Sequence, residues 1–117
     1  REEHWEAAQL GGQRAAYGML GLDAPARGTT WYWSDRHGIH LEAAGRLTGP
    51  GEIVVRDHGA HPAVFLLDDG LVAGAAAIDD TTTVRVARRL IEQRIPVTAA
   101  ELSDPAVSLR SLLKATR

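Results

Sequence analysis

The sequence has no cysteine, and this absence excludes disulfides, thiolate metal ligands, a cysteine nucleophile and a redox-active dithiol. No apolar run approaches the roughly 20 residues that cross a bilayer, so we expect no membrane association. Neither sign of charge dominates, because 13 Lys and Arg residues stand against 15 Asp and Glu residues, for a net charge of −2. We therefore expect no nucleic-acid partner, and the lack of cysteine fits a cytoplasmic protein.

The size and composition are those of one ordinary globular domain. The chain has 117 residues, of which 44% are hydrophobic and 24% are charged. The sequence begins at Arg1 rather than at Met, directly within a stretch of helix-forming residues. We interpret it as a piece of a longer protein.

Helix-forming residues at both ends flank a central region of short β-branched segments. The N-terminal stretch 2–20 predicts a helix, although the pair Gly11 and Gly12 weakens it and indicates a close neighbour against the backbone. We predict four strands, at 39–46, 52–56, 63–67 and 71–78, and helices at 81–94, 99–102 and 108–115.

The short links between the strands predict an antiparallel meander. The expected fold is therefore α+β, a two-layer sandwich with an N-terminal helix, a four-stranded antiparallel sheet and C-terminal helices. A fifth strand is the alternative.

Two histidine pairs share the pattern His-Gly-x-His, at His37 and His40 and again at His58 and His61. Four histidines are enough to bind zinc, but both pairs lie in strand and turn sequence, where positions i and i+3 do not share a face. We interpret them as solvated turn histidines and predict no metal site.

Sequence motifs for catalysis and for phosphate binding are missing. There is no Gly-x-Ser-x-Gly elbow, no Walker loop and no Gly-x-Gly-x-x-Gly. We therefore expect the chain alone to bind no dinucleotide cofactor and to be inactive.

Aromatic residues are few, and five of the six precede residue 34. Three of them form the cluster Trp31, Tyr32 and Trp33. Two interpretations remain open: an aromatic plug that pins the preceding connector onto the sheet, or a stacking surface for a planar cofactor or a partner.

The segment 31–35, Trp-Tyr-Trp-Ser-Asp, resembles the Pro-Trp-Phe-Trp-Ser-Asp-Gln signature of FAD-dependent ferredoxin reductases. That family includes the putidaredoxin reductase type and the reductase components of Rieske-type dioxygenases, with apoptosis-inducing factor as a distant relative. The likeness extends to the stretches 3–21, 49–57, 87–91 and 102–113. Thr30, Arg36 and the pair Asp79-Asp80 depart from the usual residues, Pro, Gln and Asn-Arg.

The resemblance implies a domain organisation and a function. Residues 1–21 would be the last helix of an FAD-binding domain, and residues 22–117 would be a C-terminal interface domain. The FAD and NAD domains would lie upstream in the same chain, with FAD and NAD(P)H as cofactors of the whole protein. The partner would be a [2Fe-2S] ferredoxin. A non-catalytic interaction or dimerisation module is the alternative.

The resemblance also implies site residues. Glu3 and His4 match a Glu-His pair on the flavin–nicotinamide side, Trp33 matches a tryptophan beside the isoalloxazine, and Trp31 flanks it. Glu42 matches an acidic residue near the nucleotide in the apoptosis-inducing-factor branch.

A basic helix face is a candidate contact for the partner. Arg85, Arg88 and Arg89 are spaced i, i+3 and i+4, so they lie on neighbouring positions of the predicted helix. Ferredoxins are typically acidic, and this face would attract them. The alternative is a solvated helix surface.

Overall fold

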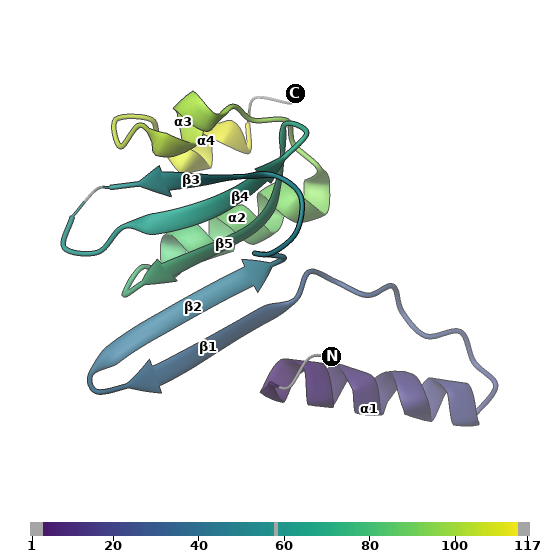
Figure 1. The fold of residues 1–117 in the computed structure, drawn as a ribbon. Helices are drawn as coiled ribbons and strands as arrows, with labels where there is room; N and C mark the ends of the chain where they lie inside the picture. The colour runs from purple at the N-terminus through teal and green to yellow at the C-terminus, as the bar shows by residue number, and fades with distance from the viewer. Residues whose placement is uncertain (1–3, 58, 115–117) are drawn as a thin grey trace.

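The computed structural model describes residues 4–57 and 59–114. Glu3 and His58 therefore lie outside the described residues. The described chain is an α+β fold with helix α1 (Trp5–Met19), a central sheet and the helices α2 (Thr81–Gln93), α3 (Ala99–Ser103) and α4 (Leu109–Leu112) (Figure 1). None of these helices is long and apolar enough to cross a membrane.

The sheet has five antiparallel strands in the order β1-β2-β5-β4-β3. Their bounds are β1 Trp31–Arg36, β2 Ile39–Gly45, β3 Glu52–Arg56, β4 Ala63–Asp68 and β5 Leu71–Ile78. The fold class is confirmed, with the fifth strand formed by the aromatic cluster itself. The predicted meander is wrong, because β2 pairs with β5 and not with β3.

Two glycines explain how the chain leaves β2 and crosses to the far edge of the sheet. Gly45 has φ of 71°, and the next residue, Arg46, donates its amide proton to the Ala73 carbonyl. A Cβ on Gly74 would lie 2.0 Å from the Arg46 carbonyl oxygen, so only glycine fits there. The Arg46 guanidinium then holds the crossing loop through the Thr48 carbonyl and pairs with Asp68 at 2.8 Å.

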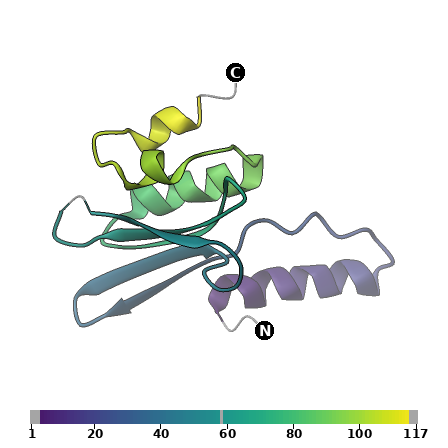
Figure 2. The same ribbon diagram turned by 45° about the horizontal axis from the view of Figure 1, so that its top comes forward.

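Helices α2, α3 and α4 cover one face of the sheet, as Figure 2 shows. The core between the two layers is built around four fully buried side chains, Phe65, Val84, Leu90 and Leu102. On α2, the buried residues follow a helical spacing and the N-cap Asp80 accepts a hydrogen bond from the Thr83 amide.

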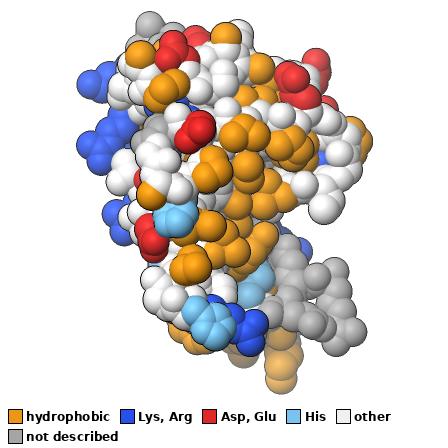
Figure 3. All heavy atoms as spheres, turned by 60° about the vertical axis from the view of Figure 1, so that its left-hand side comes forward, with side chains coloured by type: hydrophobic (Ala, Val, Ile, Leu, Met, Phe, Trp, Pro, Cys, Tyr) orange, Lys and Arg blue, Asp and Glu red, His pale blue; other side chains and the backbone are white. Residues whose placement is uncertain are grey.

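No helix of the described residues lies over the other face of the sheet. Ile53 and Val55 of β3 are 56% and 50% exposed, and Ile39 and Leu41 of β2 are exposed as well. Figure 3 shows hydrophobic side chains gathered into a connected group on one side of the molecule.

A buried arginine fastens the C-terminal helices to the sheet. Arg56 is 5% exposed, and its guanidinium donates to the backbone carbonyls of Leu102, Asp104, Pro105 and Val107. These charge-assisted hydrogen bonds offset the cost of burying the cation. Arg56 is therefore a structural residue.

Helix α1 lies beyond the β1 edge of the sheet and points away from it (Figures 1 and 2). None of its residues is buried. A Cβ on Gly11 or Gly12 would meet nothing within 4 Å among the described residues. The close neighbour expected at this glycine pair is therefore not part of the described chain.

Candidate functional site

Strand β1 presents Trp31 and Trp33 on the same face, because side chains two residues apart in a strand point the same way. The centroids of the two rings lie 4.8 Å apart, with planes inclined by 34°. Trp31 packs partly buried against the core, whereas Trp33 is 38% exposed. The sheet therefore supplies a rigid base and leaves part of one indole open.

The start of α1 contacts the same strand. The Trp5 ring lies 6.1 Å from the Trp33 ring at 60°, and the His4 ring lies 5.4 Å from that of Tyr32. The structure thus brings His4 and Trp33, both expected from the sequence, to one strand. Trp5 was not among the expected site residues. Its place among the few aromatic residues of the chain, most of which precede residue 34, was the signal that could have identified it.

His4 has one engaged nitrogen and one free nitrogen. Its Nδ1 accepts a hydrogen bond from the Ala7 amide at 3.3 Å and so caps α1. Its Nε2 is buried and has no hydrogen-bond partner among the described residues. A buried polar atom without a partner is costly, and this one lies at a candidate site.

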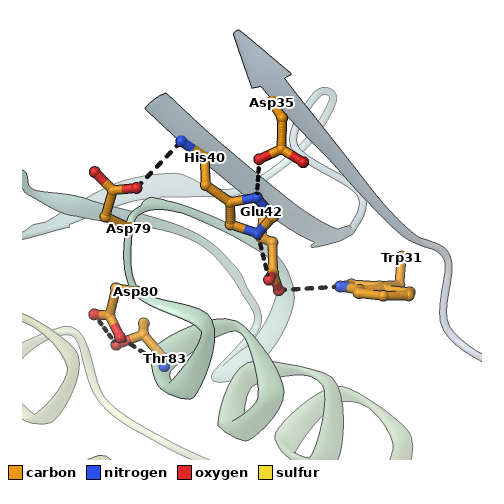
Figure 4. Close-up of polar contacts among 7 residues, drawn as sticks. All are labelled: Trp31, Asp35, His40, Glu42, Asp79, Asp80 and Thr83. Atoms are coloured by element: carbon orange, nitrogen blue, oxygen red, sulfur yellow. Dashed lines mark hydrogen bonds and ion pairs between the residues drawn. The ribbon is translucent and has the colours of Figure 1, made fainter. Parts of the chain in front are cut away.

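Glu42 is a buried carboxylate that holds Trp31. It is 5% exposed, and its Oε2 accepts a hydrogen bond from the Trp31 indole at 3.2 Å (Figure 4). Its Oε1 lies 2.7 Å from His40 Nε2. The structure therefore brings two expected residues, Trp31 and Glu42, into direct contact. Each oxygen of the carboxylate thus has a partner within the protein.

His40 joins Glu42 to a second carboxylate. Its Nδ1 lies 2.6 Å from Asp35 Oδ1, and Asp35 is paired with His40 across the β1–β2 ladder. Hydrogen bonding to Glu42, and then to Asp35, raises the pKa of His40 above its ordinary value of 6.5. The expectation that His40 is a solvated turn histidine is therefore wrong, and the signal for this contact was the alternation of His40 and Glu42 along one strand face.

The histidines do not form a metal site in the part of the chain that the structure describes. No group of three or more histidine and acidic side chains there is placed to hold a metal ion. His40 is bound by two carboxylates, and His61 lies 3.9 Å from Asp79.

The three arginines of α2 do not share one environment. The Arg88 guanidinium lies 5.4 Å from the centroid of the Trp31 ring, a cation–π arrangement, and its Nη2 donates to the Thr29 carbonyl at 3.4 Å. Arg85 and Arg89 instead line a groove of about 690 Å³ between α2 and α4, together with Arg110 and Lys114. Arg88 thus belongs to the aromatic cluster, and the other two belong to a basic groove.

Comparison with known proteins identifies the family. The family described as "Reductase C-terminal" matches residues 31–113. The chain is 40% identical, over 111 residues, to the "Biphenyl dioxygenase system ferredoxin--NAD(+) reductase component" of Paraburkholderia xenovorans (strain LB400), covering 92% of this chain and 27% of that protein. It is 34% identical, over 112 residues, to the "p-cumate 2,3-dioxygenase system, ferredoxin--NAD(+) reductase component" of Pseudomonas putida, covering 94% of this chain and 28% of that protein.

A solved structure of a complex has the same fold. The reductase in the covalent putidaredoxin reductase–putidaredoxin complex superimposes with a TM-score of 0.86 at 25% identity, over 98% of this chain and 28% of that one. The chain therefore belongs to the reductase C-terminal family. This confirms the resemblance to ferredoxin reductases that the aromatic motif and the C-terminal stretch indicated. It spans a little over a quarter of the length of these relatives.

Proposed function

We propose that this chain is the C-terminal part of an FAD-dependent NAD(P)H:ferredoxin reductase, where its aromatic surface flanks the flavin and borders the ferredoxin dock. The observation that carries the proposal is the Trp33 ring. It is partly exposed, yet it is fixed by Trp31 on the sheet and by Trp5 from α1. A large aromatic side chain held rigidly at a surface is suited to cover a planar ring and to exclude water from it.

The side chains fit one side of a flavin. The open Trp33 indole offers an apolar plane, and His4 Nε2 is a buried polar atom with no partner among the described residues. FAD, when bound in the whole protein, supplies the chemistry that divides a hydride from NAD(P)H into single electrons. The contribution of Trp33, Trp31 and His4 is to orient the cofactor and to keep water away from it.

The state of α1 supports the proposed domain organisation. Trp5, Leu10, Tyr17 and Met19 are all exposed on a helix that has no buried residue. Such an apolar helix is stabilised when another domain packs against it. We therefore assign residues 1–21 to the end of the FAD-binding domain and residues 22–117 to the interface domain.

The basic groove is the proposed contribution to ferredoxin docking. Arg85, Arg89, Arg110 and Lys114 line it, and none of these four cations makes an ion pair within residues 4–57 and 59–114. Unpaired cations along one groove attract an acidic partner over a distance. Arg88 acts differently, because its guanidinium is engaged with Trp31 and Thr29.

The uncovered sheet face favours a second candidate function, a non-catalytic interaction or dimerisation module. In this chain by itself, Ile53 is 56% exposed and Val55 is 50% exposed. A connected apolar surface of this kind is typical of an interface between proteins or domains.

Stopped-flow kinetics of the whole reductase tests the first proposal against the second. In Trp33→Ala we expect ferredoxin reduction or flavin reduction to slow by about tenfold or more, about 1.4 kcal/mol in the barrier. Ile53→Ala is the control, because Ile53 is a large exposed side chain on the uncovered sheet face and outside the aromatic cluster. Wild-type rates in Trp33→Ala, with a lowered melting temperature, would make Trp33 a packing residue and favour the second function.

A further inference from the structure

Four side chains form a continuous line of hydrogen bonds from the protein surface to the partly buried indole of Trp31. Asp35 is 68% exposed, the His40 side chain is 30% exposed and the Glu42 side chain is 7% exposed. The distances along the line are 2.6 Å from Asp35 to His40, 2.7 Å from His40 to Glu42 and 3.2 Å from Glu42 to the Trp31 nitrogen. Figure 4 shows Asp35 and Glu42 on opposite sides of the imidazole ring.

The number of protons on His40 decides whether this line is complete. An ionised carboxylate only accepts hydrogen bonds, so Asp35 and Glu42 each need a donor from the ring between them. The imidazolium ion donates from both nitrogens, whereas the neutral imidazole donates from only one. Loss of one proton therefore breaks one of the two links.

We propose that His40 is a positioning residue, which fixes the Glu42 carboxylate and through it the Trp31 indole when both of its ring nitrogens carry protons. Trp31 contacts the Trp33 ring on one side and lies beneath the Arg88 guanidinium. A change in the position of the Trp31 ring therefore also moves the partly exposed Trp33 ring that packs against it. The consequence for the flavin rests on the proposed function, but the coupling of His40 to Trp31 does not.

The charged groups around His40 favour its protonated form. Asp35 faces the ring from β1 and Glu42 from β2, and hydrogen bonding to Glu42 is the larger cause of the raised pKa. After β5, Asp79 accepts a hydrogen bond from the His40 backbone amide at 3.1 Å. His61, before β4, faces Asp79 at 3.9 Å, and Arg88 of α2 faces Trp31.

Two further charged or titratable residues follow Asp35 in the sequence and are exposed: Arg36 at the end of β1 and His37 in the turn before β2. Two carboxylates contact the His40 ring, so the positioned state persists to higher pH than the protonated form of an ordinary histidine. As the pH rises through the raised pKa, one of the two links of the His40 ring is broken and the line is no longer complete.

Nuclear magnetic resonance of the indole N–H groups tests this coupling. The whole reductase polypeptide is labelled with ¹⁵N-tryptophan, and the Trp31 signal is assigned from its disappearance in Trp31→Phe. Between pH 5 and pH 9 we expect the Trp31 signal to shift with a midpoint above 6.5, the ordinary value for histidine. In His40→Gln we expect this step to vanish.

Two further variants make the result specific. His37→Asn is the matched control, because His37 is exposed, has φ of 53° and lies on the adjacent turn, and it should leave the titration unchanged. Asp35→Asn keeps the His40–Glu42 contact but removes one charge, so the midpoint should move to lower pH. It also provides a test if His40→Gln does not fold.

A Trp31 signal that stays constant while the His40 ring titrates would overturn the proposal. So would a midpoint unchanged in Asp35→Asn, or a step that persists in folded His40→Gln.

Discussion

Trp33 lies directly opposite Glu42 in the β1–β2 ladder, while the Glu42 carboxylate binds the neighbouring indole of Trp31. A buried acidic side chain therefore orients one ring, and that ring supports the partly exposed one. The aromatic motif is in this way both a packing element and an open surface. Of the two interpretations that the sequence left open, packing applies to Trp31, and a stacking surface at Trp33 is our proposal.

We expect Arg56→Gln to be strongly destabilising. The substitution removes the guanidinium that donates to four backbone carbonyls of the α3–α4 segment and leaves buried carbonyls without donors. Each hydrogen bond from a charged group contributes about 1.5–3 kcal/mol, so a loss of at least about 3 kcal/mol in unfolding free energy should be measurable by urea denaturation. Arg85→Gln, in the exposed groove, is the control and should change stability little. Equal midpoints for the two variants would contradict the structural role of Arg56.

Replacing Gly74 should disrupt the crossover from β2. A methyl group there would lie 2.0 Å from the Arg46 carbonyl oxygen, so β5 and the crossing chain must separate. We expect Gly74→Ala to lower the melting temperature markedly. Gly28→Ala, where a Cβ meets no described residue within 4 Å, should have little effect. A Gly74→Ala protein as stable as Gly28→Ala would mean that the close approach is not present in solution.

Gly12→Ala separates the stability of α1 from its packing. Among residues 4–57 and 59–114 a Cβ at this position meets nothing within 4 Å, and alanine favours the helix by about 1 kcal/mol. Circular dichroism of the isolated chain should therefore show equal or greater helix content. In the whole reductase, we expect the same change to lower stability, because the proposed FAD-binding domain lies against this glycine pair. A gain of stability in both forms would argue against that neighbour.

Salt dependence should reveal whether the basic groove attracts ferredoxin. In Arg85→Gln/Arg89→Gln, we expect slower association of ferredoxin with the whole reductase at low ionic strength. The difference should disappear near 1 M salt, where the Debye length is about 3 Å. The double variant Arg36→Gln/Arg94→Gln removes the same charge outside the groove and should retain most of the rate. Identical association rates for wild type and the groove variant at low salt would leave Arg85 and Arg89 as ordinary surface residues.

Local sequence patterns predicted much of the fold, and the contacts between distant segments were the part they could not supply. The cap at Asp80 and the apolar spacing of α2 are local, so that helix was correctly predicted. The crossover at Gly74 depends on a neighbour almost thirty residues earlier, Arg46. Short links alone could not distinguish this order of strands from a meander.

The same distinction applies to the site. Trp31, Trp33 and Glu42 were proposed as site residues from the family resemblance, whereas the contact of His40 with Asp35 depends on pairing across a turn. Arg56 was likewise identifiable only once α3 and α4 were placed over β3. Its carbonyl partners are 46 to 51 residues away in the sequence.

The contact between Trp33 and the flavin is most directly measured by tryptophan fluorescence of the whole reductase with and without FAD. An isoalloxazine in contact with an indole quenches its emission, so removal of FAD should produce a large rise in fluorescence. We predict that this rise is much smaller in Trp33→Phe than in wild type or in Trp5→Phe. An equal rise in Trp33→Phe and wild type would show that Trp33 does not face the flavin, and would contradict the account.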